Sequence, residues 1–224
     1  MRSSPCAIVL VLALTAGASA QAPPDEKKAI GTQMPDVEFV ADDDSTFRLS
    51  ALWGKPVVVS PIFTSCPHTC GMITESLRDA LREIGEPGVG YEVLTVSFDP
   101  ADDTAAMRAY RERLSLPSGW RLATADAQNL ATFLRAMDFN VTALPEGGFA
   151  HPNLLVILSS DLKVSSYVHG VAYESAALLA ALEDASRDAS LIRRSRPFLL
   201  LVAAMGVVAI VWALRATRRR ENAR

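Results

Sequence analysis

The sequence contains no internal repeat and no low-complexity segment, so the chain is not an array of short repeated units. Basic residues are scarce in its middle part, because residues 21–192 carry 13 Lys and Arg against 24 Asp and Glu, a net charge of −11. A domain this acidic argues against nucleic acid binding. Cysteine is scarce as well, with Cys6, Cys66 and Cys70 alone among 224 residues. The length suggests one domain with appended segments.

Residues 1–20 have the pattern of a secretory signal peptide. Arg2 gives a positive start, a short apolar run extends from Ala7 to Leu14, and small residues follow at 18–20. Cleavage after Ala20 would remove Cys6 and leave Gln21 as the mature N-terminus. The alternative is an uncleaved N-terminal anchor. Either way, two cysteines remain in the domain that follows.

A second apolar run, Pro197 to Leu214, predicts a transmembrane helix. It contains no polar side chain apart from an indole, and a helix of this length reaches about 27 Å, close to the thickness of a bilayer core. A basic juxtamembrane linker (188–196) precedes it and a basic tail (215–224) follows. Because both flanks are basic, charge favours a cytoplasmic C-terminus only mildly. The signal peptide decides the predicted topology, with the domain on the periplasmic, oxidising side and the tail in the cytoplasm.

Between these ends we expect a polar tether (21–30) and one globular domain (31–187). Apolar patterns and turn residues predict strands at 37–40, 46–49, 56–60, 92–98, 120–124, 153–158 and 163–168. Helical spacing predicts helices at about 70–84, 104–114, 127–137 and 174–185, the last with Leu178, Leu179 and Leu182 facing inward. This order indicates an α/β, thioredoxin-like fold with a central mixed sheet flanked by helices.

Cys66 and Cys70, in the segment Cys-Pro-His-Thr-Cys, follow a predicted buried strand and meet the start of a helix. The N-terminus of a helix stabilises a thiolate, and the thiolate is the form that attacks disulfides and binds soft metals. Thioredoxin-type enzymes have two residues between their cysteines, whereas here there are three, which places Cys66 on the preceding loop. The pair alone leaves three interpretations open: a structural disulfide, a redox-active pair or a metal site.

A third ligand would favour the metal site, and the chain has three histidines to supply it. His68 lies between the cysteines and is expected to face solvent, while His169 ends a strand and is expected to be partly buried. His151 precedes Pro152 and a predicted strand, the place of the residue before the cis-proline in thioredoxin-like folds. That loop faces the cysteine loop, so we predict that His151 joins the cysteines and that the His151–Pro152 bond is cis.

These residues resemble the Sco (SenC) family of copper chaperones, which assist assembly of the dinuclear copper site of cytochrome c oxidase. The resemblance covers about residues 34–174. It is carried by Gly54-Lys-Pro56, by Phe63-Thr-Ser-Cys-Pro67 with Cys70, by Val96-Ser-Phe-Asp-Pro100 with Asp103 and Thr104, and by His151 before an apolar strand. It implies that Cys66, Cys70 and His151 bind copper. Asp99 is expected either to order the loop near the metal or to serve only as a turn residue before Pro100.

Two thiolates and one imidazole suit Cu(I) and can also accept Cu(II), whereas zinc prefers a fourth ligand. We therefore expect a copper-binding assembly factor that delivers copper to the copper-bearing subunit of cytochrome c oxidase and is not an enzyme in the turnover sense. The alternative is a thiol–disulfide oxidoreductase that reduces the copper-ligating cysteines of the oxidase. A third possibility is an inert disulfide. Because copper and a disulfide exclude each other, the oxidising compartment also implies a periplasmic thiol reductant.

Overall fold

The structure is a computed structural model that describes residues 23–187. The predicted signal peptide (1–20), the predicted transmembrane helix (197–214) and the basic segments beside it therefore lie outside the described residues. Within residues 23–187, no helix is both long enough and apolar enough to cross a membrane.

Seven strands form one mixed sheet in the order β2-β1-β5-β4-β3-β8-β9. In chain order they are β1 (Glu38–Ala41), β2 (Thr46–Arg48), β3 (Val57–Ile62), β4 (Glu92–Ser97), β5 (Trp120–Thr124), β8 (Leu154–Leu158) and β9 (Val164–His169). Strands β3, β4 and β5 are parallel to one another, and the other neighbours pair antiparallel. The mixed α/β sheet predicted from the sequence is confirmed.

The centre of the sheet is completely covered, because every residue of β3, β4 and β8 is buried. This agrees with the continuous apolar runs expected of strands covered on both faces. Pro61 interrupts the hydrogen-bonding capacity of β3, since proline has no N–H. The position tolerates it because β3 pairs with β8 only from Val57 to Val59, so Pro61 lies beyond that ladder.

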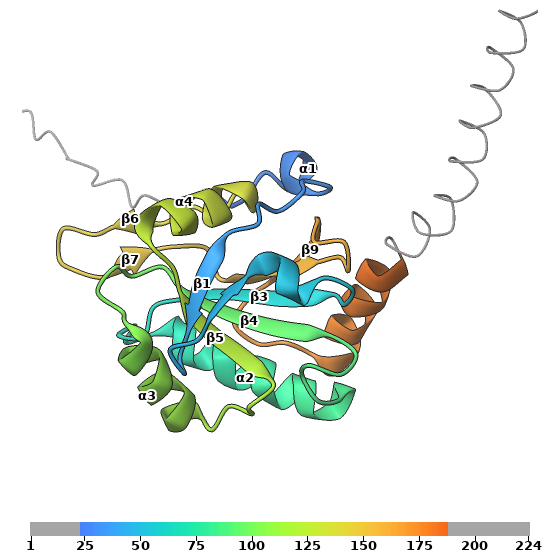
Figure 1. The fold of residues 1–224 in the computed structure, drawn as a ribbon, viewed down its shortest axis with the longest axis horizontal. Coiled ribbons are helices and arrows are strands. Elements are labelled where there is room, and N and C mark those ends of the chain that lie inside the picture. The colour runs from blue at the N-terminus through green and yellow to red at the C-terminus, as the bar shows by residue number, and fades with distance from the viewer. Residues whose placement is uncertain (1–22, 188–224) are drawn as a thin grey trace, which may run out of the picture.

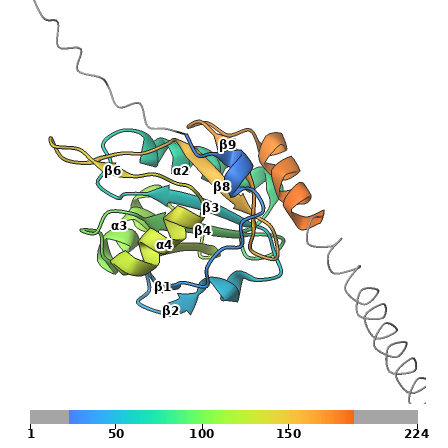
Figure 2. The same cartoon turned by 90° about the horizontal axis from the view of Figure 1, so that it is seen from above.

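Helices cover both faces of the sheet (Figure 1). Helices α2 (Thr69–Ile84) and α3 (Thr104–Leu114) lie on one face, and α4 (Ala127–Ala136) lies on the other, as the view from above also shows (Figure 2). Asp103 caps α3 by accepting from the N–H of Ala106, and Asp126 caps α4 in the same way. A final helix runs from residue 175 to the end of the described residues at 187.

Four details differ from the sequence-based expectations. The segment expected to be only a tether contains one helical turn, α1 (Glu26–Ala29), which packs near β9. A 3-10 helix (Leu49–Leu52) follows β2, and a small hairpin joins β6 (Thr142–Ala143) to β7 (Phe149–Ala150). On the final helix Leu178 and Leu182 are buried, but Leu179 is 41% exposed. The prediction that Leu179 faces inward is wrong. Each residue of an α-helix is rotated by 100° about the helix axis relative to the one before it, so Leu179 points away from the side that buries Leu178.

Candidate metal centre

The two cysteines lie where β3 gives way to α2. Strand β3 ends at Ile62 and α2 begins at Thr69, so Cys66 lies on the connecting loop and Cys70 is in the first turn of the helix. Both sulfurs are free; Cys66 is partly exposed, whereas Cys70 is fully buried. The loop turns back on itself, since the N–H of Cys66 donates to the carbonyl of Phe63 at 3.3 Å.

His151 lies beside this pair, on the segment between β7 and β8. Strand β8 is the neighbour of β3 in the sheet, which brings the start of β8 to the end of β3. The Nε2 atom of His151 is 3.8 Å from the sulfur of Cys70, and the three possible ligand atoms of Cys66, Cys70 and His151 all lie within 4.8 Å of one another. The structure thus brings together all three predicted ligands.

The other two histidines are not part of this group. His68 is exposed, as predicted. His169 is also exposed, and its Nε2 atom lies 2.6 Å from the carboxylate of Glu26 on α1. The expectation of a partly buried His169 is therefore wrong, because α1 reaches β9 and supplies a surface partner that the sequence did not reveal.

The spacing of the three donor atoms fits one metal ion. Bonds from a metal to sulfur and nitrogen are about 2.0–2.3 Å long, so two donors on one ion are separated by up to about 4.6 Å. The three donor atoms are at most 4.8 Å apart, so a small adjustment of side-chain angles brings them into this range. Within residues 23–187 no other group of three His, Cys, Asp or Glu residues offers such a set.

The two thiols differ in acidity. Burial raises the pKa of Cys66, but the backbone N–H groups of Cys70, His68 and Thr69 outweigh burial, so that its pKa is lowered overall. These N–H groups belong to the start of α2, where a helix favours negative charge. Burial raises the pKa of Cys70 to about 12. In the metal-free, reduced chain the loop sulfur is therefore the better nucleophile, and the helix sulfur stays protonated.

This difference predicts unequal alkylation. With limiting iodoacetamide at neutral pH, Cys66 of the reduced chain should be modified more than about tenfold faster than Cys70, because only the thiolate reacts and Cys70 is buried. Peptide mapping by mass spectrometry after short exposures would measure both rates in one sample. The same experiment in urea is the control, since unfolding should make the rates similar. Equal rates in the folded chain would contradict the assigned environments.

His151 is held in its neutral form. Its Nδ1 atom lies 3.1 Å from the carbonyl of Pro152, and since a carbonyl only accepts, Nδ1 carries the proton and Nε2 presents a lone pair toward Cys70. Burial lowers the pKa of His151, although the Pro152 carbonyl acts in the opposite direction. The imidazole is therefore unprotonated at pH 7, as metal binding requires.

Aromatic rings fix the position of this imidazole. The ring of His151 lies 5.0 Å from Phe98, 6.0 Å from Phe63 and 6.2 Å from Phe139, measured between centroids. Phe149 contacts Phe63 and Phe98 in turn. These rings exclude water from one side of the ligand group.

The prediction of a cis bond before Pro152 is wrong, since residues 23–187 contain no cis peptide bond. Contacts with these rings, rather than a cis bond, place His151.

Asp102 orders the cysteine loop, one of the two roles expected of Asp99 from the sequence. Its carboxylate accepts from the N–H and the hydroxyl of Thr64 at 2.8 and 2.5 Å, and from the hydroxyl of Ser97 at 2.5 Å. It therefore ties the loop to the end of β4. The carboxylate of Asp99 accepts from the N–H of Ala101 and its carbonyl from the N–H of Asp102, which makes Asp99 the turn residue of the second interpretation. The two carboxylates could not be distinguished from the sequence alone.

Tyr110 of α3 is hydrogen-bonded to the first turn of α2. Its hydroxyl donates to the carbonyl of Cys70 at 3.0 Å. The hydroxyl of Thr74 lies 2.8 Å from the hydroxyl oxygen of Tyr110 and donates to it, because the Tyr110 proton is already used. Arg113 stacks on the ring of Tyr110 and donates to the carbonyl of Thr64 at 3.2 Å. The helix that carries Cys70 and the loop that carries Cys66 are thus both tied to α3.

Comparison with known proteins agrees with this geometry. A sequence model of the SCO1/SenC family matches residues 25–186. A solved structure from Aquifex aeolicus VF5, described as a candidate electron transfer protein, is 33% identical with a TM-score of 0.68 and covers 70% of this chain and 94% of its own. Among curated proteins, no sequence matches this chain.

Two more distant structures share the fold. ScoI of Bradyrhizobium japonicum, solved with copper bound, is 18% identical with a TM-score of 0.59, and the match covers 69% of this chain and 98% of that one. BsSco, a member of the Sco family of cytochrome c oxidase assembly proteins in which a disulfide switch was identified, is 19% identical with a TM-score of 0.60, over 69% and 93% of the two chains. At this level of identity the likeness concerns the fold alone.

Proposed function

Because this chain belongs to the SCO1/SenC family, we propose that it binds one copper ion through Cys66, Cys70 and His151 and acts in the assembly of cytochrome c oxidase. One observation carries the proposal: the two sulfurs and Nε2 of His151 lie within 4.8 Å of one another although the histidine is far away in the sequence. Copper in a family relative and the oxidase-assembly role of another support it.

The donor set selects copper by its chemistry. Two thiolates and one imidazole are soft ligands that suit Cu(I), and the imidazole also makes Cu(II) acceptable. Structural zinc would ordinarily take a fourth protein ligand, and no fourth His, Cys, Asp or Glu joins the group within residues 23–187. Cys66 contributes the more acidic thiol, Cys70 loses its proton only when the metal binds, and His151 needs no deprotonation.

Copper loading tests the proposal directly. The reduced full-length chain should take up one equivalent of Cu(I) in an anaerobic titration against a chromophoric chelator. The chain oxidised at Cys66 and Cys70 should take up none, because the disulfide consumes both thiolates. Binding of copper by the oxidised chain, or no binding by the reduced chain, would contradict the proposed site.

A finer part of the proposal is delivery of this copper to the copper-bearing subunit of the oxidase. The alternative is reduction of the cysteines of that subunit. The difference in pKa between Cys66 and Cys70 favours this alternative, because one thiol can attack while the other stays protonated. The Cys66 thiolate would attack a disulfide of the partner, forming a mixed disulfide and releasing one partner thiolate. Cys70 would then give up its proton and attack the sulfur of Cys66, releasing the second partner thiolate, which takes up a proton. The partner thereby gains two electrons and this chain becomes the disulfide. A periplasmic thiol reductant would restore the pair in either case.

Loss of Asp102 should weaken the site without touching a ligand. For Asp102→Ala we expect the affinity for Cu(I) to fall about 10- to 100-fold, as is typical when groups that orient ligands are removed. The free energy of unfolding of the copper-free chain should fall by about 1–3 kcal/mol, because the N–H of Thr64 loses its partner. Chelator competition and urea unfolding measure the two effects. Asp99→Ala is the matched control and should leave copper affinity near that of the wild type.

We also propose that the domain lies on the periplasmic side of a membrane, held by the apolar run at 197–214 after export by the signal peptide. The apolar pattern of both segments and their basic flanks support this topology. A reporter active only in the periplasm should work when inserted near residue 190, and one active only in the cytoplasm should work after Arg224. The opposite pattern would contradict the topology.

A further inference from the structure

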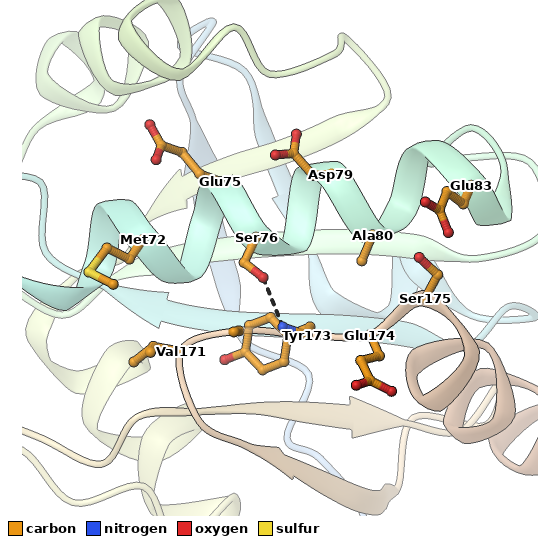
Figure 3. A pocket seen from close by; sticks show the side chains of 11 residues that line it. Met72, Glu75, Ser76, Asp79, Ala80, Glu83, Val171, Tyr173, Glu174 and Ser175 are labelled. Atoms are coloured by element: carbon orange, nitrogen blue, oxygen red, sulfur yellow. Dashed lines mark hydrogen bonds between the residues drawn. The ribbon is translucent and has the colours of Figure 1, made fainter.

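A groove of about 700 Å³ runs along α2, the helix that carries Cys70. Figure 3 shows α2 as one wall and residues 171–175 as the other, joined where the N–H of Tyr173 donates to the hydroxyl of Ser76 at 2.8 Å. Met72 lies at the end near the cysteines, two residues after Cys70. The groove is therefore continuous with the helix that carries one of the ligands.

The groove is acidic and has no basic residue in its lining. Its four carboxylates come from both walls: Glu75, Asp79 and Glu83 from α2, and Glu174 from the opposite segment. Asp79 is balanced by Arg78 and Arg82 at 3.0 and 3.6 Å. In the part of the chain that the structure describes, the other three have no ion-pair partner.

Apolar surface accompanies these charges. The side chain of Met72 is 53% exposed, an unusual position for a large apolar residue in a domain with so few of them at the surface. Ala80, Val171 and Ala172 continue the apolar lining along the groove. Methionine side chains adapt to different partners, and for this reason they are frequent at binding surfaces. The groove thus offers three unpaired negative charges beside a flexible apolar contact.

We propose that this groove docks a cationic segment of a partner protein, with Lys or Arg side chains at Glu75, Glu83 and Glu174 and an apolar side chain at Met72. Charge complementarity identifies the occupant, because three unpaired carboxylates attract a basic segment and repel an anionic surface. Docking at Met72 would place the partner at the N-terminal end of α2, in whose first turn Cys70 lies. This proposal rests on the proposed function in one respect: the partner is taken to be the protein that exchanges copper or electrons with this chain.

The test uses the copper-free, reduced full-length chain in a nonionic detergent. The probe is a capped octapeptide of alternating lysine and alanine, titrated by calorimetry at low ionic strength against detergent blanks. Octapeptides with glutamine or glutamate in place of lysine are the peptide controls. The groove variant carries Glu75→Gln, Glu83→Gln and Glu174→Gln. The matched control variant carries Glu38→Gln, Glu112→Gln and Glu146→Gln, three exposed positions outside the groove that change the net charge equally.

The groove variant should lose about tenfold in affinity for the lysine peptide, as expected for three exposed ion pairs, whereas the control variant should change less than twofold. Carbodiimide should cross-link the peptide to Glu75, Glu83 or Glu174 of the wild type. Equal losses in both variants would overturn the proposal, because the peptide would then respond only to overall charge. Equal binding of the glutamine peptide would overturn it too.

Two other occupants have their own signatures. If replacing Arg193, Arg194 and Arg196 by glutamine strengthened peptide binding, the groove would belong to the basic linker of this chain and not to a partner. If sedimentation showed a dimer of the wild type that the groove variant lost, a second copy would be the occupant. Either result overturns the proposal. The copper titration is independent of all these measurements, so failure of the groove and failure of the copper site are distinguishable.

Discussion

Replacement of Cys70 by serine should lower the affinity of the reduced chain for Cu(I) by more than about 100-fold, since even loss of a group that merely orients a ligand costs 10- to 100-fold. A hydroxyl is a hard and weakly acidic donor, so serine keeps the volume of the side chain but does not supply a soft ligand. Cys66→Ser should have an effect of the same size. Competition with a chromophoric Cu(I) chelator under anaerobic conditions measures both.

The interpretation of this experiment depends on the fold remaining intact. Cys70 is fully buried, so the variant needs a circular dichroism spectrum and a urea unfolding curve alongside the titration. Ser65→Ala, on the same loop, is the matched control and should bind copper like the wild type. A Cys70→Ser chain that is folded and binds Cu(I) with wild-type affinity would exclude Cys70 as a ligand.

Replacement of His151 by alanine should separate the copper carrier from the thiol reductase. We expect Cu(I) affinity to fall by about 100-fold or more and Cu(II) to be lost more completely, because the imidazole is the only nitrogen donor in the group. The reduction potential of the Cys66–Cys70 pair should move by less than about 30 mV, equivalent to 1.4 kcal/mol. Chelator competition and equilibration with glutathione give the two quantities.

His169→Ala is the control for this variant, since His169 lies at the surface beside Glu26. Oxidase assembly in cells that carry only the variant then decides between the functions. Full assembly with His151→Ala would favour the thiol–disulfide oxidoreductase, because that reaction needs only the cysteines. Failed assembly together with unchanged copper binding would show that His151 is not a ligand.

The sheet was largely predictable because its central strands have a clear pattern in the sequence. The runs that became β3 and β8 are mostly apolar, and the one that became β4 has apolar residues at 93, 94 and 96. All three are short and bounded by loops, and all their residues are buried. The hairpin β6–β7 was not predicted, because its four residues are exposed or only partly buried and so carry no apolar pattern. Helix α1 was missed for a similar reason, since four residues are too few to show helical spacing.

The three candidate ligands were predictable from their order relative to the strands, whereas the groups that hold them were not. Asp102 reaches Thr64 across 38 positions, and the Asp-Pro motif gives no sign of which nearby carboxylate does so. The rings around His151 come from three separate segments, after β3, after β4 and after α4. Such contacts depend on tertiary packing. Local pattern therefore identified the donors but not the surroundings that position them.

The 81 positions between Cys70 and His151 have a consequence for heat resistance. An unfolded chain does not hold His151 beside the cysteines, so an ion that binds all three favours the folded state by mass action, by at most about 4.1 kcal/mol when free copper exceeds the dissociation constant a thousandfold. A disulfide between Cys66 and Cys70 closes a short loop, and the lost entropy of the unfolded chain favours the folded state by about 2 kcal/mol, roughly half as much. The melting temperature of this protein would then distinguish its three states: highest with copper bound, intermediate for the oxidised chain and lowest for the metal-free reduced chain.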